Sequence, residues 1–131
     1  DLRTAFTEAG KLVDSFYENR GFRTEVKYFR NVLSSAAAGE RTNFLKSDGY
    51  VVHTLEAAVW CILNSSSYPE TVLSAVNLGY DTDTTAAVAG GLAGLYYGIE
   101  DIPDEWIDAI ARRGDVVDLC VRFNHLYGNP E

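Results

Sequence analysis

Apolar residues recur at intervals of three and four along nearly the whole chain, and this spacing constrains the fold more than any other feature. Such spacing places apolar side chains on one face of an α-helix. No pair of alternating segments is joined by a hairpin turn, so we expect an all-α fold, a compact multi-helix bundle without a sheet. The first helix shows the pattern clearly, with apolar positions at Leu2, Ala5, Phe6, Ala9, Leu12, Val13, Phe16 and Tyr17.

Capping and turn residues divide this pattern into segments. Thr24 can cap a second helix, and residues 39–52 contain enough helix breakers to predict an irregular loop. Residues 54–64 are apolar on almost every side, which predicts a helix buried in the middle of the bundle. Pro69 fits the first turn of the next helix, and Gly79 can end it in a left-handed conformation. The core face expected for the second helix is Val26, Phe29, Leu33 and Ala36.

The C-terminal part of the chain predicts two more helices. Pro103 with the two acidic residues after it opens one of them, and Arg112, Arg113 and Gly114 close it. A last helix is expected over residues 115–127. Trp60 and Trp106 are interpreted as core residues and His125 as structural or exposed. The residues expected to face inward from the last helix are Val116, Leu119, Cys120, Phe123 and Leu126.

The composition limits the classes of partner and compartment. The chain has 131 residues, 11 basic against 19 acidic, and a formal net charge of -8, which argues against a nucleic-acid surface. No segment is long and apolar enough for a membrane span. Cys61 and Cys120 lie in apolar helical patterns without metal-ligand spacing, so we expect reduced core thiols and a cytoplasmic protein. Because there is no methionine and the chain opens on Asp1, we expect a fragment or a processed piece.

The most informative segment is the acidic run Asp81-Thr82-Asp83-Thr84-Thr85 between two predicted helices. Asp and Thr are common helix N-caps, so capping alone explains one of the carboxylates. Two carboxylates so close together repel each other and favour a counter-charge. A hard cation such as Mg²⁺ or Mn²⁺ accepts carboxylate and hydroxyl oxygens. The spacing by itself leaves capping and metal binding both open.

Two other acidic motifs fit less well. An EF-hand loop beginning at Asp81 needs Gly at its sixth position and Glu at its twelfth, where the chain has Ala86 and Leu92. The pattern Asp81-x-Asp83-x-Thr85 also matches the nucleophile motif of haloacid-dehalogenase-like phosphatases. That chemistry needs a parallel sheet, which the helical pattern does not predict.

Three segments in order resemble the C-terminal part of the ADP-ribosylglycohydrolase family, which includes the dinitrogenase reductase-activating glycohydrolases. The strongest is residues 79–94, GYDTDTTAAVAGGLAG, followed by Tyr97 and Gly98. The second is residues 48–60, DGYVVHTLEAAVW, and a weaker third is residues 102–106, IPDEW. The resemblance implies an all-α fold with two divalent cations, Mg²⁺ or Mn²⁺, at the base of a cleft.

The resemblance also implies roles for particular residues. Asp81, Asp83 and Thr84 would be the metal ligands from this part of the fold, with Asp83 bridging both ions. Asp81 and Asp83 would accordingly be the catalytic residues. Tyr50 would line the ADP-ribose pocket, and Gly49 would let the loop backbone approach the ligand. His53 is assigned no catalytic role.

The chain departs from the family pattern in one respect, since it contains no Thr-Asp-Asp tripeptide, which the family carries in its N-terminal part. Residues 1–131 are therefore expected to be the C-terminal part of one ADP-ribosylglycohydrolase-like domain. The implied function is metal-dependent removal of ADP-ribose from modified proteins or small compounds, with no turnover unless the N-terminal half is present. The alternative is a non-catalytic crystallin-like or ADP-ribose-binding member of the same fold.

Overall fold

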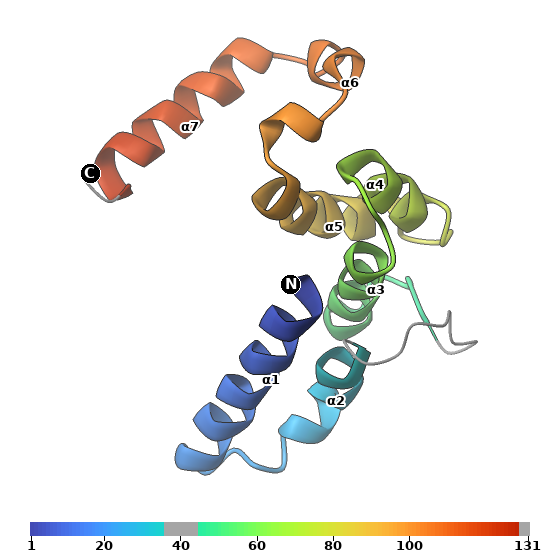
Figure 1. Ribbon diagram of the computed structural model, residues 1–131, viewed down its shortest axis with the longest axis vertical. Helices are drawn as coiled ribbons and strands as arrows, with labels where there is room; N and C mark the ends of the chain where they lie inside the picture. Colours follow the sequence, from blue (N-terminus) through green and yellow to red (C-terminus); the bar gives the residue numbers. More distant parts are fainter. Residues whose placement is uncertain (36–44, 129–131) are drawn as a thin grey trace. The chain divides into compact units, whose positions relative to one another are not determined.

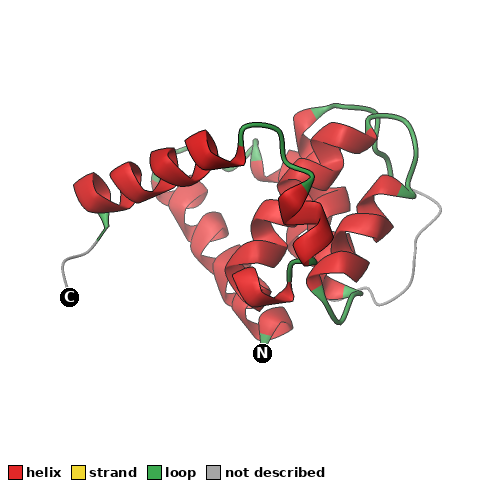
Figure 2. Ribbon diagram, turned by 90° about the horizontal axis from the view of Figure 1, so that it is seen from above, coloured by secondary structure: helices red, strands yellow, loops and turns green. Residues whose placement is uncertain are grey.

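The computed structural model describes residues 1–35 and 45–128 of the chain. Across these residues it contains α-helices and one 3-10 helix, and no β-strand, which confirms the all-α prediction (Figures 1 and 2). None of the described helices combines the length and apolarity needed to cross a bilayer. The helices in order are α1 (Leu2–Asn19), α2 (Val26–Ser35), α3 (Val51–Leu63), α4 (Tyr68–Val76), α5 (Thr82–Tyr97), η1 (Ile99–Asp101), α6 (Asp104–Asp108) and α7 (Arg113–Tyr127).

The chain divides into two compact units, Asp1–Asp101 and Ile102–Glu131. The first contains α1 to α5 with η1, and the second contains α6 and α7. That both belong to one larger domain stays a prediction.

Helix α3 is the centre of the first unit, as its apolar sequence predicts. It packs against α2, α4 and α5, and most of its residues are buried. It begins at Val51, earlier than expected, so the preceding loop ends at Tyr50. The part of that predicted loop at 39–44, and Ala36 of the predicted α2 core face, lie outside the described residues.

Small side chains allow α3, α4 and α5 to approach closely. Ala58, Ala75 and Ala89 come from these three helices and are fully buried together with Cys61. Alanine costs no side-chain entropy on burial and leaves room for neighbouring backbones. A second cluster, formed by Val59, Ile62, Leu63 and Ala93, adds larger side chains to the same interface.

We expect Ile62→Ala to lower the free energy of unfolding by about 2–4 kcal/mol. Ile62 is only 2% exposed and is the largest fully buried side chain, so truncation leaves a cavity in the α3–α5 interface. Ile99→Ala is the matched control, because Ile99 is 68% exposed and its truncation should cost less than about 0.5 kcal/mol. Denaturant unfolding of both variants measures the difference, and equal losses would contradict this location of the core.

The start of α4 follows its sequence signals. Ser67 is the N-cap and accepts from the Glu70 amide, and Pro69 lies in the first turn. Helix α4 ends at Val76, and Gly79, a few residues later, has the predicted left-handed conformation with φ +82°. The chain therefore reverses direction directly before α5.

The second unit corrects several expectations. Helix α6 ends at Asp108, before the predicted stop, and α7 already begins at Arg113 and includes Gly114. Cys120 is exposed, whereas Cys61 is buried as expected, and neither forms a disulfide bond. Trp60 and Trp106, expected in the core, are half-buried, and Trp60 packs against the buried cluster around Ala58 and Cys61. The residues expected to face inward from α7 are exposed, among them Val116, Leu119, Phe123 and Leu126 at 47% to 74%.

The exposed face of α7 has a simple physical cause. Its unit offers only the short helix α6 as a packing partner. A helix buries an apolar face only when another element covers it. The apolar spacing predicted the helix correctly, but burial depends on a second layer, and among the described residues of this unit the other helix is the short α6.

Candidate functional site

The acidic loop between α4 and α5 has an unusual backbone. Gly79 and Tyr80 both lie in the left-handed region, with φ of +82° and +59°. A tyrosine rarely adopts this conformation, because its Cβ crowds the following carbonyl. The two residues turn the chain so that Asp81 becomes the N-cap of α5 and Asp83 falls in its first turn.

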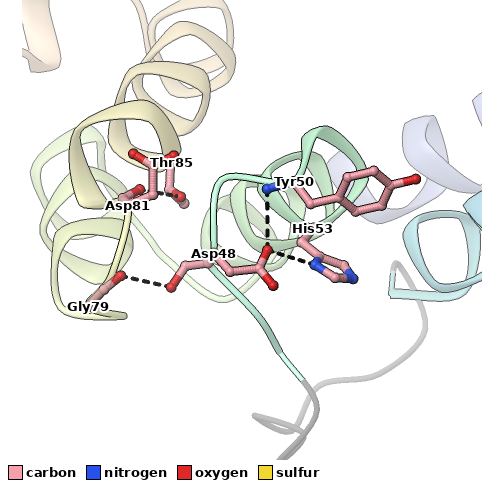
Figure 3. A network of polar contacts seen from close by, with 7 residues as sticks. Asp48, Tyr50, His53, Gly79, Asp81 and Thr85 are labelled. Atoms are coloured by element: carbon pink, nitrogen blue, oxygen red, sulfur yellow. Dashed lines mark hydrogen bonds and ion pairs between the residues drawn. The ribbon is translucent and has the colours of Figure 1, made fainter.

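Asp81 is fixed by its main chain, while its carboxylate makes no capping hydrogen bond (Figure 3). The Asp81 amide donates to the Ser47 carbonyl over 2.9 Å. The Asp81 carbonyl accepts from the buried Thr85 hydroxyl over 2.9 Å and from the Thr85 amide over 3.2 Å. Simple side-chain capping, one of the two interpretations of this loop, is therefore not what Asp81 does.

The Asp81 carboxylate lies instead against Gly49, in the loop before α3. A Cβ on Gly49 would be 2.5 Å from Asp81 Oδ2, closer than real side chains approach. Gly49 also has φ +80°, which favours glycine. Glycine is thus favoured here by its own backbone conformation, and any larger side chain would displace the Asp81 carboxylate. Two sequence motifs expected to share a site do lie in contact here.

Asp81 and Asp83 also interact with each other. A hydrogen bond with the Asp81 carboxyl group holds the pKa of Asp83 below its ordinary value, and backbone amides at the start of α5 act in the same direction. Asp83 and Thr84 are exposed and Asp81 is half-buried. Two carboxylates separated by a single residue repel each other and favour a counter-charge such as a bound cation.

The loop that carries Gly49 is held by a hydrogen bond between Asp48 and His53. The Asp48 Oδ1 atom lies 2.8 Å from His53 Nδ1 and accepts from the Tyr50 amide over 3.2 Å (Figure 3). The hydrogen bond with His53, then that with Tyr50, lowers the pKa of Asp48. The Tyr50 ring packs edge-on against His53, with centroids 5.0 Å apart, and stays 52% exposed. Tyr50 is therefore oriented and still accessible to a ligand.

A recess lies beside the acidic loop. Its volume is about 350 Å³, within the usual size range of small-molecule sites. It is lined by Leu45, Lys46, Ser47, Asp48, Leu78 and Tyr80. Residues 45–48 thus form a concave surface together with Leu78 and Tyr80, next to the predicted site residues, which do not line it.

The structure gathers the predicted residues only in part. Gly49 and Asp81 touch, and Asp81 pairs with Asp83. Within residues 1–35 and 45–128, however, no three His, Cys, Asp or Glu side chains form a metal-binding group. The predicted metal ligands remain a prediction.

Sequence reasoning missed the residues that support this site. Ser47 and Thr85 hold the Asp81 main chain, and the pair of Asp48 and His53 holds the Gly49 loop. Thr85 belongs to the acidic run itself, so its position was a visible signal. Ser47 gave no such signal, because the residue that its hydroxyl group contacts, Gly79, lies 32 positions away in the chain.

Comparison with known proteins gives a consistent result. The family model described as ADP-ribosylglycohydrolase matches residues 1–131. The ADP-ribosylarginine hydrolase Tri1 of Pseudomonas putida (strain GB-1) is 48% identical over 67 residues, 51% of this chain and 18% of that protein. Its counterpart in Serratia proteamaculans (strain 568) is 40% identical over 87 residues, 66% of this chain and 23% of that protein.

A third relative is named for a different substrate. The ADP-ribosyl-[dinitrogen reductase] glycohydrolase of Rhodospirillum rubrum is 35% identical over 65 residues, 50% of this chain and 22% of that protein. The matched part of this chain thus spans about a fifth of the length of these relatives. Because the family model covers every residue of an all-helical chain, the chain belongs to the ADP-ribosylglycohydrolase family.

Proposed function

We propose that this chain supplies the C-terminal part of the active site of a metal-dependent hydrolase that removes ADP-ribose from modified proteins or small compounds. Asp81, Asp83 and Thr84 are its metal ligands in this proposal. Gly49 and Tyr50 form the side of the site that meets the ADP-ribose group. The relatives named as ADP-ribosylarginine hydrolases make the arginine linkage the first substrate to test.

The observation that carries the proposal is the position of the Asp81 carboxylate. Asp81 occupies an N-cap, yet its carboxylate does not cap the helix and lies instead against Gly49. A carboxylate needed only for helix stability would accept from the free amides of the first turn. Two paired carboxylates at a loop edge favour a cation.

The donor set suits Mg²⁺ or Mn²⁺, which prefer carboxylate, hydroxyl and water oxygens. Asp81, Asp83 and Thr84 offer oxygens of these kinds at the start of α5. The remaining protein ligands are proposed to come from the family's Thr-Asp-Asp motif, outside these 131 residues. Bound divalent cations would orient the ribose hydroxyl groups, activate a water molecule and stabilise developing charge.

The other residues of the site bind and orient. Because Gly49 lies against Asp81, a ligand that contacts the Gly49 backbone is brought beside the acidic pair. Tyr50, held edge-on by His53, presents an exposed aromatic surface to that ligand. The contact between the two loops therefore sets the distance from Gly49 and Tyr50, which would bind the ligand, to the proposed metal ligands.

A chimera tests this function. Residues 1–131 replace the corresponding C-terminal part of the Pseudomonas putida hydrolase, which contributes the N-terminal part of the fold. With Mn²⁺ or Mg²⁺ present, we expect release of ADP-ribose from ADP-ribosylated arginine, with serine-linked and small-molecule conjugates assayed in parallel. A chimera that folds, as judged by circular dichroism, and binds ADP-ribose but releases none from any conjugate would refute the hydrolase and favour a binding protein.

A further inference from the structure

Ser47 contacts both sides of the left-handed turn that carries Asp81. Its hydroxyl group donates to the Gly79 carbonyl over 2.8 Å, and its carbonyl accepts from the Asp81 amide over 2.9 Å. The residue is only 4% exposed. One buried serine thus binds the residues before and after Tyr80, which is itself 91% exposed.

The turn needs such support. Tyr80 has φ +59°, and its exposed side chain provides no packing that would hold it in this conformation. A non-glycine residue persists in the left-handed region only where the surrounding structure determines it. The two hydrogen bonds of Ser47 hold the residues before and after Tyr80, and so keep the tyrosine in this conformation.

The same segment also fixes the other side of the site. Two residues after Ser47, the Gly49 backbone lies against the Asp81 carboxylate, and Tyr50 follows directly. Residues 47–50 therefore contact the acidic loop at Gly79, at the Asp81 amide and at the Asp81 carboxylate. A shift of Ser47 would move Asp81 relative to Tyr50.

We propose that Ser47 is a positioning residue for the metal site: by holding the turn at 79–81, it fixes the Asp81 carboxylate beside Gly49 and sets the affinity for the divalent cation. The inference deepens the proposed function and rests on it for the cation. Its structural part, the placement of Asp81 by Ser47, stands on the hydrogen bonds alone.

Amide hydrogen exchange tests the structural part on the 131-residue chain without metal. Ser47→Ala should speed exchange of the Asp81 amide roughly tenfold, since it loses one buried hydrogen bond that holds its acceptor in place. Ser65→Ala is the matched control, because the Ser65 hydroxyl also donates to a backbone carbonyl, that of Cys61, over 2.8 Å. It should leave the Asp81 amide unchanged. Unchanged exchange in a folded Ser47→Ala chain would overturn the inference.

Metal affinity tests the functional part in the chimera. Ser47→Ala should raise the Mn²⁺ dissociation constant, measured by electron paramagnetic resonance, on the order of tenfold, as loss of outer-shell support does. Ser65→Ala should change it less than about twofold while lowering the melting temperature similarly. If both variants lose thermal stability but keep the same Mn²⁺ affinity, Ser47 has only a structural role and the inference is wrong.

A second substitution separates positioning from general destabilisation. Glycine adopts the left-handed conformation readily, so Tyr80→Gly in the Ser47→Ala background should restore most of the lost Mn²⁺ affinity. Failure of the glycine to restore affinity would contradict a role in holding the turn. If the unsubstituted chimera binds no Mn²⁺, the proposed function fails, and the exchange rates still decide whether Ser47 places Asp81.

Discussion

Alanine in place of Asp83 is expected to abolish hydrolysis by the chimera, lowering kcat/KM on the order of a thousandfold. A bound metal contributes several kcal/mol of transition-state stabilisation, and about 4 kcal/mol corresponds to a factor of a thousand. Asp83 lies in the first turn of α5 and interacts with the Asp81 carboxyl group. Its loss removes one of the two carboxylates proposed to hold the cations. Release of ADP-ribose and Mn²⁺ binding are the measurements.

The control for Asp83→Ala must remove a similar charge without touching the site. Glu70 is also an exposed acidic residue in the first turn of a helix, α4, in the same unit and at the opposite end of that helix from the acidic loop. Glu70→Ala therefore matches the change in net charge and in helix-dipole interaction. It should leave both hydrolysis and Mn²⁺ affinity unchanged. Full activity in a folded Asp83→Ala chimera would rule out Asp83 as a metal ligand.

Gly49→Ala is expected to damage the site through the close approach of Asp81. The added Cβ would be 2.5 Å from Asp81 Oδ2, so the carboxylate or the loop must move. The φ of +80° adds a conformational cost of about 1–2 kcal/mol. Displacement of a ligand carboxylate should weaken Mn²⁺ binding on the order of tenfold to a hundredfold, comparable to loss of the groups that orient a metal ligand. Metal titration and denaturant unfolding measure the two effects.

Gly21→Ala separates these two effects. Gly21 has a similar φ of +77°, but nothing lies within 4 Å of an added Cβ. It should lose about as much stability from the backbone conformation as Gly49→Ala does. It should keep its Mn²⁺ affinity. If both variants bind Mn²⁺ equally well, the contact between Gly49 and Asp81 has no part in metal binding.

The sequence predicted the helices because helix formation depends on local spacing. Helix α3 is central and buried, as its apolar sequence indicates, and Gly79 is left-handed, as its position after a helix predicts. The prediction that the apolar face of α7 is buried was wrong, because burial depends on contacts that are not local. Periodicity identifies the apolar face of a helix, but not whether another element covers it.

The acidic loop shows the same division at the level of the site. The local run Asp81-Thr82-Asp83-Thr84 was enough to single out these residues, and the segment around Gly49-Tyr50 was enough to suggest the family. The sequence did not reveal that the Asp81 carboxylate lies against Gly49 and does not cap the helix. Choosing between capping and another role required that geometry.

The sequence by itself thus determined the helical class, the helix that carries the acidic pair and the family, since each depends on residues close together in the chain. Only the tertiary structure decided how Asp81 is held. Ser47 donates a hydrogen bond to Gly79, 32 positions away in the chain. Gly49, which has no side chain, lets the Asp81 carboxylate from a different loop approach closely. Contacts of this kind depend on how α3, α4 and α5 pack through their alanines, and no local pattern encodes the meeting of two loops.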